Sequence, residues 1–199
     1  MDLDDLRRNF LRFTDRAFGL LPPMEHPRIL DIGCGTGVPT VRLAELTDGQ
    51  IVGLDLDREA LETLRGRAGD LGISDRIEVR AGSLDEIPFE DGSFDLLWCE
   101  GAVSALGFRE SLRSWRRLLK PGGCLVLHDQ AGDVGEKILA VREEGYTFLG
   151  HFEVPERAWW DGFYALADGE LGLAEEISQF QARPEEFRSA FFVLRLEEG

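Results

Sequence analysis

The sequence predicts a doubly wound α/β domain, in which helices cover both faces of a mostly parallel sheet. Three observations lead to this prediction. Short apolar runs that end in glycine or aspartate alternate with stretches of helical period along the chain. A glycine-rich turn follows the first apolar run, and no repeat, low-complexity linker or break in composition interrupts the 199 residues. A chain of this length can bury one substantial core.

The first strand is expected between two helices. A helix is predicted over 2–20, where apolar residues recur at helical spacing until an LLPP stretch ends it. RILDIG, residues 28–33, is typical of a buried strand because it is a short apolar run that ends in glycine. The next helix covers 38–47, with Pro39 in its first turn, where a missing N–H costs nothing.

The remaining elements continue the alternation. Helices are expected over 58–72, 109–119 and 133–144, and a KPGG turn ends the second of them. Strands are expected over 50–57, 76–82, 93–101, 124–129, 146–154 and 187–196. Only the segment between the last two strands departs from the pattern for long. The carboxyl ends of the strands therefore become the place to look for a ligand site.

The charge balance argues against one class of partner. The chain has 38 acidic and 22 basic residues, a net charge of −16. Phosphate contacts need a basic surface, so nucleic acid is not expected to bind. An acidic surface also suits a salt-rich cytoplasm, but codon bias with ordinary solubility explains it as well, and both explanations stay open.

The sequence shows no sign of a membrane or secreted protein. No apolar run approaches the roughly 20 residues that span a bilayer, and the start MDLDDLRRNFLRF lacks the pattern of a signal peptide. We therefore expect a cytoplasmic protein without membrane contact. Cys34, Cys99 and Cys124 are isolated and lack ligand spacing, which predicts reduced packing residues and no metal site.

ILDIGCGTG, residues 29–37, contains the candidate nucleotide loop. A dinucleotide fingerprint, G-x-G-x-x-G, would place its third glycine where this chain has Val38; Gly37 gives G-x-G-x-G instead. This spacing favours a compact ligand over a pyrophosphate. Asp31 can pair with a cationic group, and the N-terminus of the next helix can bind a carboxylate. A ligand with an ammonium and a carboxylate would satisfy both.

Asp55 ends the second predicted strand, 18 positions after Gly37. An acidic residue at this place can accept hydrogen bonds from both hydroxyls of a ribose. The alternative is a strand-end carboxylate without a ligand. The neighbouring Asp57 is expected to cap the following helix.

Four segments together resemble the class I S-adenosylmethionine-dependent methyltransferase family, closest to the methyltransferase type 11 branch and its quinone-biosynthesis relatives. They are LDIGCGTG, GLDLD, AGSLDEIPFEDGSFDLLWCEGAV and LLKPGGCLVLHD, in family order from residue 28 to about 130. The resemblance implies a Rossmann-like, seven-stranded mixed sheet of order 3-2-1-4-5-7-6 with the last strand antiparallel. It also implies methyl transfer from S-adenosylmethionine to a small molecule, with S-adenosylhomocysteine as the product.

The resemblance assigns the cofactor to particular residues. The methionine moiety would lie on Asp31 and the glycine loop, the ribose on Asp55 and the adenine beside Leu56. Family members often carry G-D-A after the third strand, where this chain has Ser83 and Leu84 after a glycine. Ser83 is a weaker acceptor, although the Leu84 amide can bond a ring nitrogen. The predicted cofactor residues are Asp31, Gly33, Gly35, Gly37, Asp55, Leu56, Ser83, Leu84 and Glu100.

Glu100 and His128 are the catalytic candidates. Glu100 follows the fourth strand, where the resemblance places the reacting sulfonium; a carboxylate there can stabilise positive charge, orient the substrate or act as a base. Its alternative is an ordinary solvated acid in a turn. His128 ends the fifth strand beside Asp129 and is a candidate general base, although a single histidine is often structural. Methyl transfer depends mainly on positioning, so a catalytic triad is not required.

The acceptor site is expected outside these motifs. The insert 155–186 starts at the carboxyl end of the sixth strand, on the cofactor side. Trp159, Trp160 and Tyr164 there suit a lid over an apolar or aromatic acceptor; equally, they can simply pack the insert onto the domain. Phe10, Phe13 and Phe18 of the first helix are expected to form the other wall.

We therefore interpret residues 1–199 as one domain. It has an N-terminal helical cap over 1–27, a cofactor-binding core over 28–154, the insert or lid over 155–186 and a final strand over 187–196. An NAD(P)-dependent oxidoreductase is an alternative that Val38 disfavours, and a non-catalytic S-adenosylmethionine-binding relative is another. The protein is expected to be a monomer or a homodimer.

Overall fold

The computed structural model describes residues 2–132, 134–167 and 171–197. Its centre is a seven-stranded sheet of order β3-β2-β1-β4-β5-β7-β6. The first five strands pair in parallel, and β7 pairs antiparallel with both β5 and β6. The predicted fold class, strand order and antiparallel last strand are confirmed.

The strands lie close to the predicted ranges. They are β1 (Arg28–Ile32), β2 (Gln50–Asp55), β3 (Ile77–Ala81), β4 (Phe94–Glu100), β5 (Leu119–Gln130), β6 (Tyr146–Val154) and β7 (Ser189–Leu196). β5 begins earlier than the predicted 124–129, because Leu119 pairs with Phe94 of β4 and the KPGG stretch continues the strand. The predicted turn at KPGG is therefore wrong.

The helices follow the expected alternation. They are α1 (Leu3–Arg8), α2 (Leu11–Phe18), α3 (Val38–Leu46), α4 (Arg58–Asp70), α5 (Phe108–Trp115), α6 (Val134–Glu143), α7 (Glu156–Trp159) and α8 (Ala174–Ala182). The short helical turns are η1 (Val103–Ala105), η2 (Arg116–Leu118), the π-helical η3 (Trp160–Tyr164) and η5 (Pro184–Phe187). Residue 133 of the predicted helix 133–144 and residues 168–170 of the insert lie outside the described residues. No helix in the described ranges is long and apolar enough to cross a bilayer.

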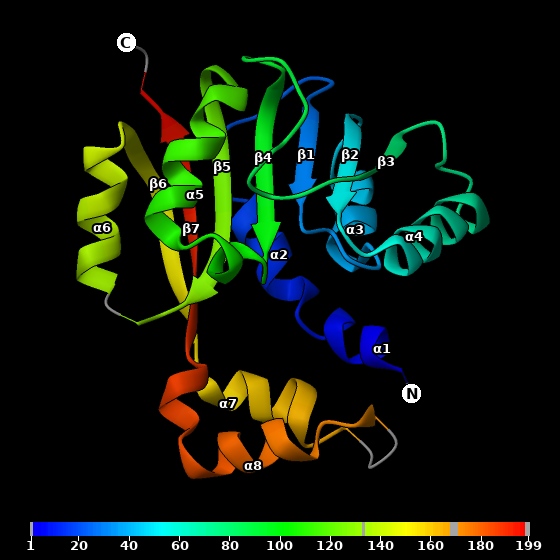
Figure 1. Ribbon diagram of the computed structural model, residues 1–199, viewed down its shortest axis with the longest axis vertical. Helices are drawn as coiled ribbons and strands as arrows, with labels where there is room; N and C mark the ends of the chain where they lie inside the picture. Colours follow the sequence, from blue (N-terminus) through cyan, green and yellow to red (C-terminus); the bar gives the residue numbers. More distant parts are fainter. Residues whose placement is uncertain (1, 133, 168–170, 198–199) are drawn as a thin grey trace.

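Helices cover both faces of the sheet (Figure 1), with α5 and α6 in front of it and α2 and α3 behind. Leu30 and Ile32 of β1 belong to the apolar cluster that contains Trp115 of α5, whereas Ile29 belongs to the cluster of Leu43 in α3. This division follows from the two-residue period of a strand. Because β1 is buried on both faces, its sequence is a nearly continuous apolar run. The three cysteines are buried and free, as predicted.

The N-terminal segment differs from the single helix predicted over 2–20. The helix breaks at Asn9 and Phe10, which separate α1 from α2. Asn9 follows the last residue of α1, and its side-chain amide donates a hydrogen bond to the Gly162 carbonyl of the insert at 2.8 Å. A contact between residues this distant in sequence leaves no local periodic signal, so the break could not be predicted.

A third apolar cluster lies beyond the carboxyl ends of the central strands. It joins Leu6 of α1 to four residues of the insert: Phe163, Tyr164, Leu173 and Phe180. Figure 1 shows α1, α7 and α8 on the side of the sheet to which the arrowheads of β1 and β4 point. We call α1, α2 and residues 155–167 and 171–187 the roof, because together they cover the edge at which doubly wound folds bind ligands.

A substitution at Gly37 tests how closely the glycine loop approaches α4. Its φ is +82°, and an added Cβ would lie 2.2 Å from Cδ1 of Leu64. Gly37→Ala should therefore lower the free energy of unfolding by about 1–3 kcal/mol, measured by urea denaturation. Gly66 is the control, because it lies in α4 with no atom within 4 Å of the added Cβ. Gly66→Ala should stabilise the protein by about 0.5–1 kcal/mol; a loss at both positions would contradict this explanation.

Candidate active site

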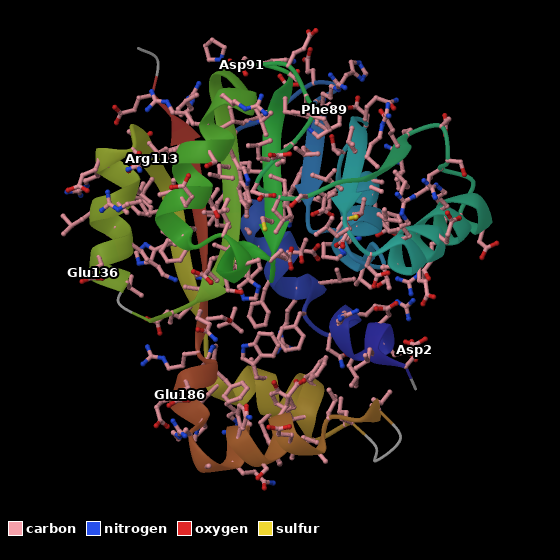
Figure 2. The ribbon with its side chains drawn as sticks, in the orientation of Figure 1. Asp2, Phe89, Asp91, Arg113, Glu136 and Glu186 are labelled. Atoms are coloured by element: carbon pink, nitrogen blue, oxygen red, sulfur yellow. The ribbon has the colours of Figure 1, made fainter. Side chains whose placement is uncertain are left out.

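A cavity of about 420 Å³ lies beyond the carboxyl ends of β1, β4 and β5, enclosed by the glycine loop and the roof. Figure 2 shows side chains packed into the space between the strand ends and α7. The cavity brings together seven of the predicted site residues: Asp31, Gly33, Gly35, Glu100, His128, Trp159 and Tyr164.

Asp31 is a buried carboxylate at the end of β1, with only 1% of its surface exposed. The hydroxyl of Thr40, in α3, donates a hydrogen bond to Oδ2 at 2.6 Å. Burial raises the pKa of Asp31 from 3.8 to about 7; the Thr40 hydrogen bond opposes this rise and the charge of Asp55 adds to it. A positively charged ligand group would stabilise the ionised form.

Glu100 is a second carboxylate on the same cavity, at the end of β4. The Thr14 hydroxyl of α2 and the Trp98 indole both donate to its Oε1, at 2.9 and 2.8 Å. Oε2 accepts no hydrogen bond from the residues that the structure describes. Burial raises the pKa of Glu100 to about 7, the two hydrogen bonds oppose this rise, and Asp31 adds to it. The cavity therefore holds two carboxylates and favours a cationic ligand.

The glycine loop brings its backbone to the cavity wall. Gly33 and Gly35 have φ values of +73° and +51°. A Cβ on Gly33 would lie 2.3 Å from Cβ of Ala102, so this position has no room for a side chain. A Cβ on Gly35 would meet no protein atom within 4 Å, although Gly35 borders the cavity. The loop thus leaves an open place for a ligand to approach its backbone.

Asp55 and Leu56 lie outside the cavity, at the end of β2. Oδ2 of Asp55 accepts a hydrogen bond from the Gly35 amide at 2.8 Å, and Oδ1 accepts one from the Asp57 amide at 2.9 Å. Leu56 is 66% exposed, so it is not a core residue. Asp57 caps α4 by accepting from the amides of the first turn, which confirms the predicted cap.

Three other predicted cofactor residues also lie outside the cavity. Gly37 packs against α4, as described above. The Ser83 hydroxyl donates a hydrogen bond to Asp85. The Leu84 carbonyl accepts a hydrogen bond from the Trp115 indole at 2.9 Å. The structure therefore separates an enclosed region near Asp31 and Glu100 from an open region near Asp55 and Leu56.

His128 is buried at the end of β5. Its Nε2 lies 2.8 Å from the Ser189 hydroxyl, to which the Trp159 indole donates a hydrogen bond at 3.1 Å. The His128 ring stacks on Phe191 with a centroid distance of 4.3 Å and an interplanar angle of 8°. Burial lowers the pKa of His128 to about 4, an effect that Asp129 partly opposes. The imidazole is therefore neutral near pH 7.

Aromatic side chains from both roof segments line the cavity. Trp159, Phe163 and Tyr164 come from the insert, and Phe10 comes from the start of α2. The rings of Phe10 and Trp159 lie 4.5 Å apart. Burial raises the pKa of Tyr164 to about 12, with a further contribution from Glu176, so its hydroxyl stays protonated.

Three of the aromatic residues that the sequence proposed for the acceptor site do not border the cavity. Trp160 stacks on Phe180 with ring centroids 5.6 Å apart, and packs the insert. Phe13 and Phe18 pack on the cluster of buried residues around α3.

Sequence reasoning missed Thr14, Trp98 and Ser189. Thr14 was one polar position on a predicted helix, and Trp98 belonged to an apolar run that indicated a buried strand. Ser189 is a small residue at the start of the last strand. Trp98 lies in a segment that resembles the family, but no sequence pattern links it to Glu100, and Thr14 and Ser189 stand in no motif, so only the fold could reveal these contacts.

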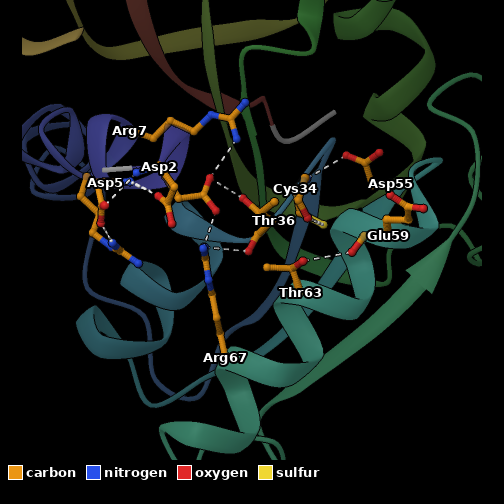
Figure 3. A network of polar contacts seen from close by, with 12 residues as sticks. Asp2, Asp5, Arg7, Cys34, Thr36, Asp55, Glu59, Thr63 and Arg67 are labelled. Carbon is orange, nitrogen blue, oxygen red and sulfur yellow. Dashed lines mark hydrogen bonds and ion pairs between the residues drawn. The ribbon is translucent and has the colours of Figure 1, made fainter. Parts of the chain in front are cut away.

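Asp4 connects α1 to the glycine loop and to α4. Its carboxylate accepts hydrogen bonds from Thr36 at 2.7 Å and Arg7 at 2.9 Å, and it forms an ion pair with Arg67. Figure 3 shows Arg7, Thr36 and Arg67 converging from three elements. Burial alone would raise the pKa of Asp4, but these three partners lower it. This cluster, the Asp4 network, holds the roof against the loop.

Asp4→Ala should loosen α1. Because several hydrogen bonds to a charged group are lost, we expect amide exchange in α1 to rise about tenfold or more, measured by hydrogen–deuterium exchange. Arg8→Ala is the control, since among the described residues Arg8 pairs with Asp5 of the same helix alone. Exchange in α1 that Asp4→Ala leaves unchanged would show that other contacts hold the roof.

Comparison with known proteins agrees with the fold. Residues 29–123 match the family model for a methyltransferase domain. The chain is 35% identical over 119 residues to 27-O-demethylrifamycin SV methyltransferase of Amycolatopsis mediterranei, covering 59% of this chain and 44% of that protein. It is 32% identical over 124 residues to the ubiquinone/menaquinone biosynthesis C-methyltransferase UbiE of Pseudomonas syringae pv. syringae, covering 61% and 48%. The chain thus spans less than half the length of these relatives.

A solved structure shows the same fold over nearly the whole chain. The crystal structure of the [4+2]-cyclase SpnF superposes with a TM-score of 0.79, covering 94% of this chain and 82% of that one at 21% identity. The matched segment contains β1, the glycine loop and β4, which carry Asp31 and Glu100. Over residues 29–123 the chain is similar to the methyltransferase domain, and its fold is that of class I S-adenosylmethionine-dependent methyltransferases.

Proposed function

We propose that the protein is a methyltransferase of EC class 2.1.1 that moves a methyl group from S-adenosylmethionine to a small-molecule acceptor. The observation that carries this proposal is the pair of carboxylates, Asp31 and Glu100, on one cavity beside the glycine loop. The cofactor has an ammonium and a sulfonium, and the two carboxylates provide a counter-charge for each.

The residues present fit the cofactor. Asp31 and the backbone at Gly35 would hold its methionine end. Asp55, outside the cavity at the end of β2, would accept from the ribose hydroxyls, and the exposed Leu56 would offer an apolar surface to the adenine. Ser83 and Leu84 remain candidates for contacts to the adenine edge. When bound, the cofactor supplies an activated methyl group on a positively charged sulphur.

Glu100 has two roles in this proposal. In its ionised form it stabilises positive charge in the enclosed cavity, where electrostatic interactions are stronger than in water. Its pKa of about 7 also lets it accept a proton from the methyl acceptor near neutral pH. Thr14 and Trp98 hold one oxygen in place and leave the other to do this.

The acceptor would bind between the sulfonium position and the roof. Trp159, Tyr164 and Phe10 provide aromatic surface there, which suits an apolar or aromatic acceptor. The cavity of about 420 Å³ must also receive the reacting end of the cofactor, so the acceptor is small unless the roof moves.

Ligand binding tests the choice of cofactor. Isothermal titration should give a roughly micromolar Kd for S-adenosylhomocysteine and no heat with NADH. Asp55→Ala should weaken binding about 100-fold, because two hydrogen bonds to a charged acceptor are lost. Glu78→Ala, at an exposed site on β3, is the control and should bind like the wild type. Binding of NADH in place of S-adenosylhomocysteine would favour the oxidoreductase alternative.

The variant Glu100→Gln tests how much the negative charge of Glu100 contributes to cofactor binding, because it removes the charge and keeps nearly the same side-chain shape. Glutamine keeps an oxygen that accepts from Thr14 and Trp98 but removes the negative charge. S-adenosylmethionine should lose affinity about tenfold, and more than the product does, because only the cofactor has a charged sulphur. Both affinities are measured by titration, together with transfer of labelled methyl groups to candidate acceptors. Equal losses for both ligands would argue against a contact between Glu100 and the sulfonium.

The pH dependence of stability tests the burial of Asp31. Its pKa is raised in the folded state, so its contribution to stability is present below about pH 4 and is lost as the pH rises to about 7. In the protein without ligand, Asp31→Asn should therefore gain stability relative to wild type between about pH 4 and pH 8, by up to about 4 kcal/mol. Urea denaturation measures this difference, and a constant difference over that range would contradict it.

A further inference from the structure

The two nitrogens of the His128 ring have different surroundings. An indole N–H can only donate, so the Ser189 oxygen accepts from Trp159. The Ser189 hydroxyl hydrogen has no other acceptor within the described ranges, and Nε2 of His128 lies 2.8 Å away. Donation from the hydroxyl to Nε2 gives this hydrogen a partner, and in that arrangement Nε2 carries a lone pair.

The remaining nitrogen then carries the proton. A neutral imidazole has one N–H, so Nδ1 is the donor when Nε2 accepts. Nδ1 makes no hydrogen bond to a described residue, yet no fully buried side-chain nitrogen or oxygen among those residues lacks a partner. Nδ1 thus keeps some access to open space, and the space that His128 borders is the cavity.

We propose that His128 binds the methyl acceptor as a neutral hydrogen-bond donor through Nδ1, and that Ser189 is the positioning residue that selects this tautomer. Stacking on Phe191 at 4.3 Å, parallel to Trp159 at 6.2 Å, confines the ring to one plane. Within that plane the hydrogen bond from Ser189 decides which nitrogen faces the cavity. The assignment of the acceptor rests on the proposed methyl transfer.

The direction of this hydrogen bond selects a class of acceptor. A donor beside the reacting atom favours a molecule with a carbonyl, phenolate or carboxylate oxygen, or an unprotonated ring nitrogen, at that place. It disfavours an ammonium group, which has no lone pair to offer. Glu100 is paired with His128 across β4 and β5, so a base and a donor stand side by side at the strand ends. Proton removal is then the task of Glu100, and His128 orients the acceptor.

Nuclear magnetic resonance of the imidazole nitrogens tests the tautomer without any substrate. The chain has three histidines, and His26 and His151 are exposed, so they serve as internal references. In the ¹⁵N-labelled wild type near pH 7, His128 should show a protonated Nδ1 and an unprotonated Nε2. A protonated Nε2 with a free lone pair on Nδ1 would overturn the proposal and restore His128 as a candidate base.

Variants of Ser189 test the positioning role. Ser189→Ala should shift His128 toward the tautomer protonated at Nε2 and leave the His26 and His151 signals unchanged. Ser189→Thr keeps the hydroxyl and should restore the wild-type pattern. An unchanged His128 tautomer in Ser189→Ala would show that Ser189 does not select it. These readouts do not depend on methyl transfer.

Labelled methyl groups test the acceptor class. From an equal mixture of phenols, carboxylic acids and amines, label should enter molecules with an oxygen acceptor beside the reacting atom; label in amines alone would overturn this assignment of the acceptor class.

Variants of His128 test its role in binding the acceptor. On the molecule that takes up label, His128→Leu should lower kcat/KM about tenfold, whereas removal of a general base would lower it about 10²–10⁴-fold. His128→Asn, which retains a donor near Nδ1, should recover most of the loss. No label in any molecule would count against methyl transfer, not against the tautomer.

Discussion

The site depends on two carboxylates on one cavity, Asp31, which is buried, and Glu100, which is partly buried. β1 and β4 are neighbours in the sheet, so Asp31 and Glu100, at their carboxyl ends, face the same enclosed space. Burial favours the protonated form of each, and so does repulsion from another carboxylate, Asp55 for Asp31 and Asp31 for Glu100. The hydrogen bonds from Thr40, Thr14 and Trp98 reduce this cost without removing it. A positively charged ligand would offset the remaining cost of ionising the two carboxylates.

The roof affects how strongly the carboxylates of the cavity interact with a bound cation. α2 places Thr14 against Glu100, so the N-terminal segment contributes a contact to the site as well as covering it. The Asp4 network fastens α1 to the loop that borders the cavity. Interactions between these carboxylates and a bound cation are stronger where the roof limits contact with water. The same elements therefore cover the site and hold one of its two carboxylates, Glu100, in place.

Local sequence patterns predicted most of the helices and strands and several residues of the site. The apolar runs, the capping Asp57 and the order of motifs gave the alternation of elements, and the rule for strand ends brought Asp31, Glu100 and His128 to one cavity. The resemblance to a family supplied the strand order. The sequence could not predict contacts between distant residues. Thr14 and Glu100 are 86 positions apart in the sequence, and His128 and Ser189 are 61 positions apart. Such pairs have no periodic signal, because only the folded sheet brings them together.

The small apolar cluster around Leu6 and Tyr164 lies apart from the residues proposed for the cofactor. It is built from the two roof segments, which come from opposite parts of the chain and lie outside the segment 29–123 that matches the methyltransferase domain. Substitutions there can reshape the wall that faces the acceptor while the residues proposed for the cofactor stay as they are. A change in the roof would therefore alter the proposed acceptor site without touching Asp31, the glycine loop or Asp55.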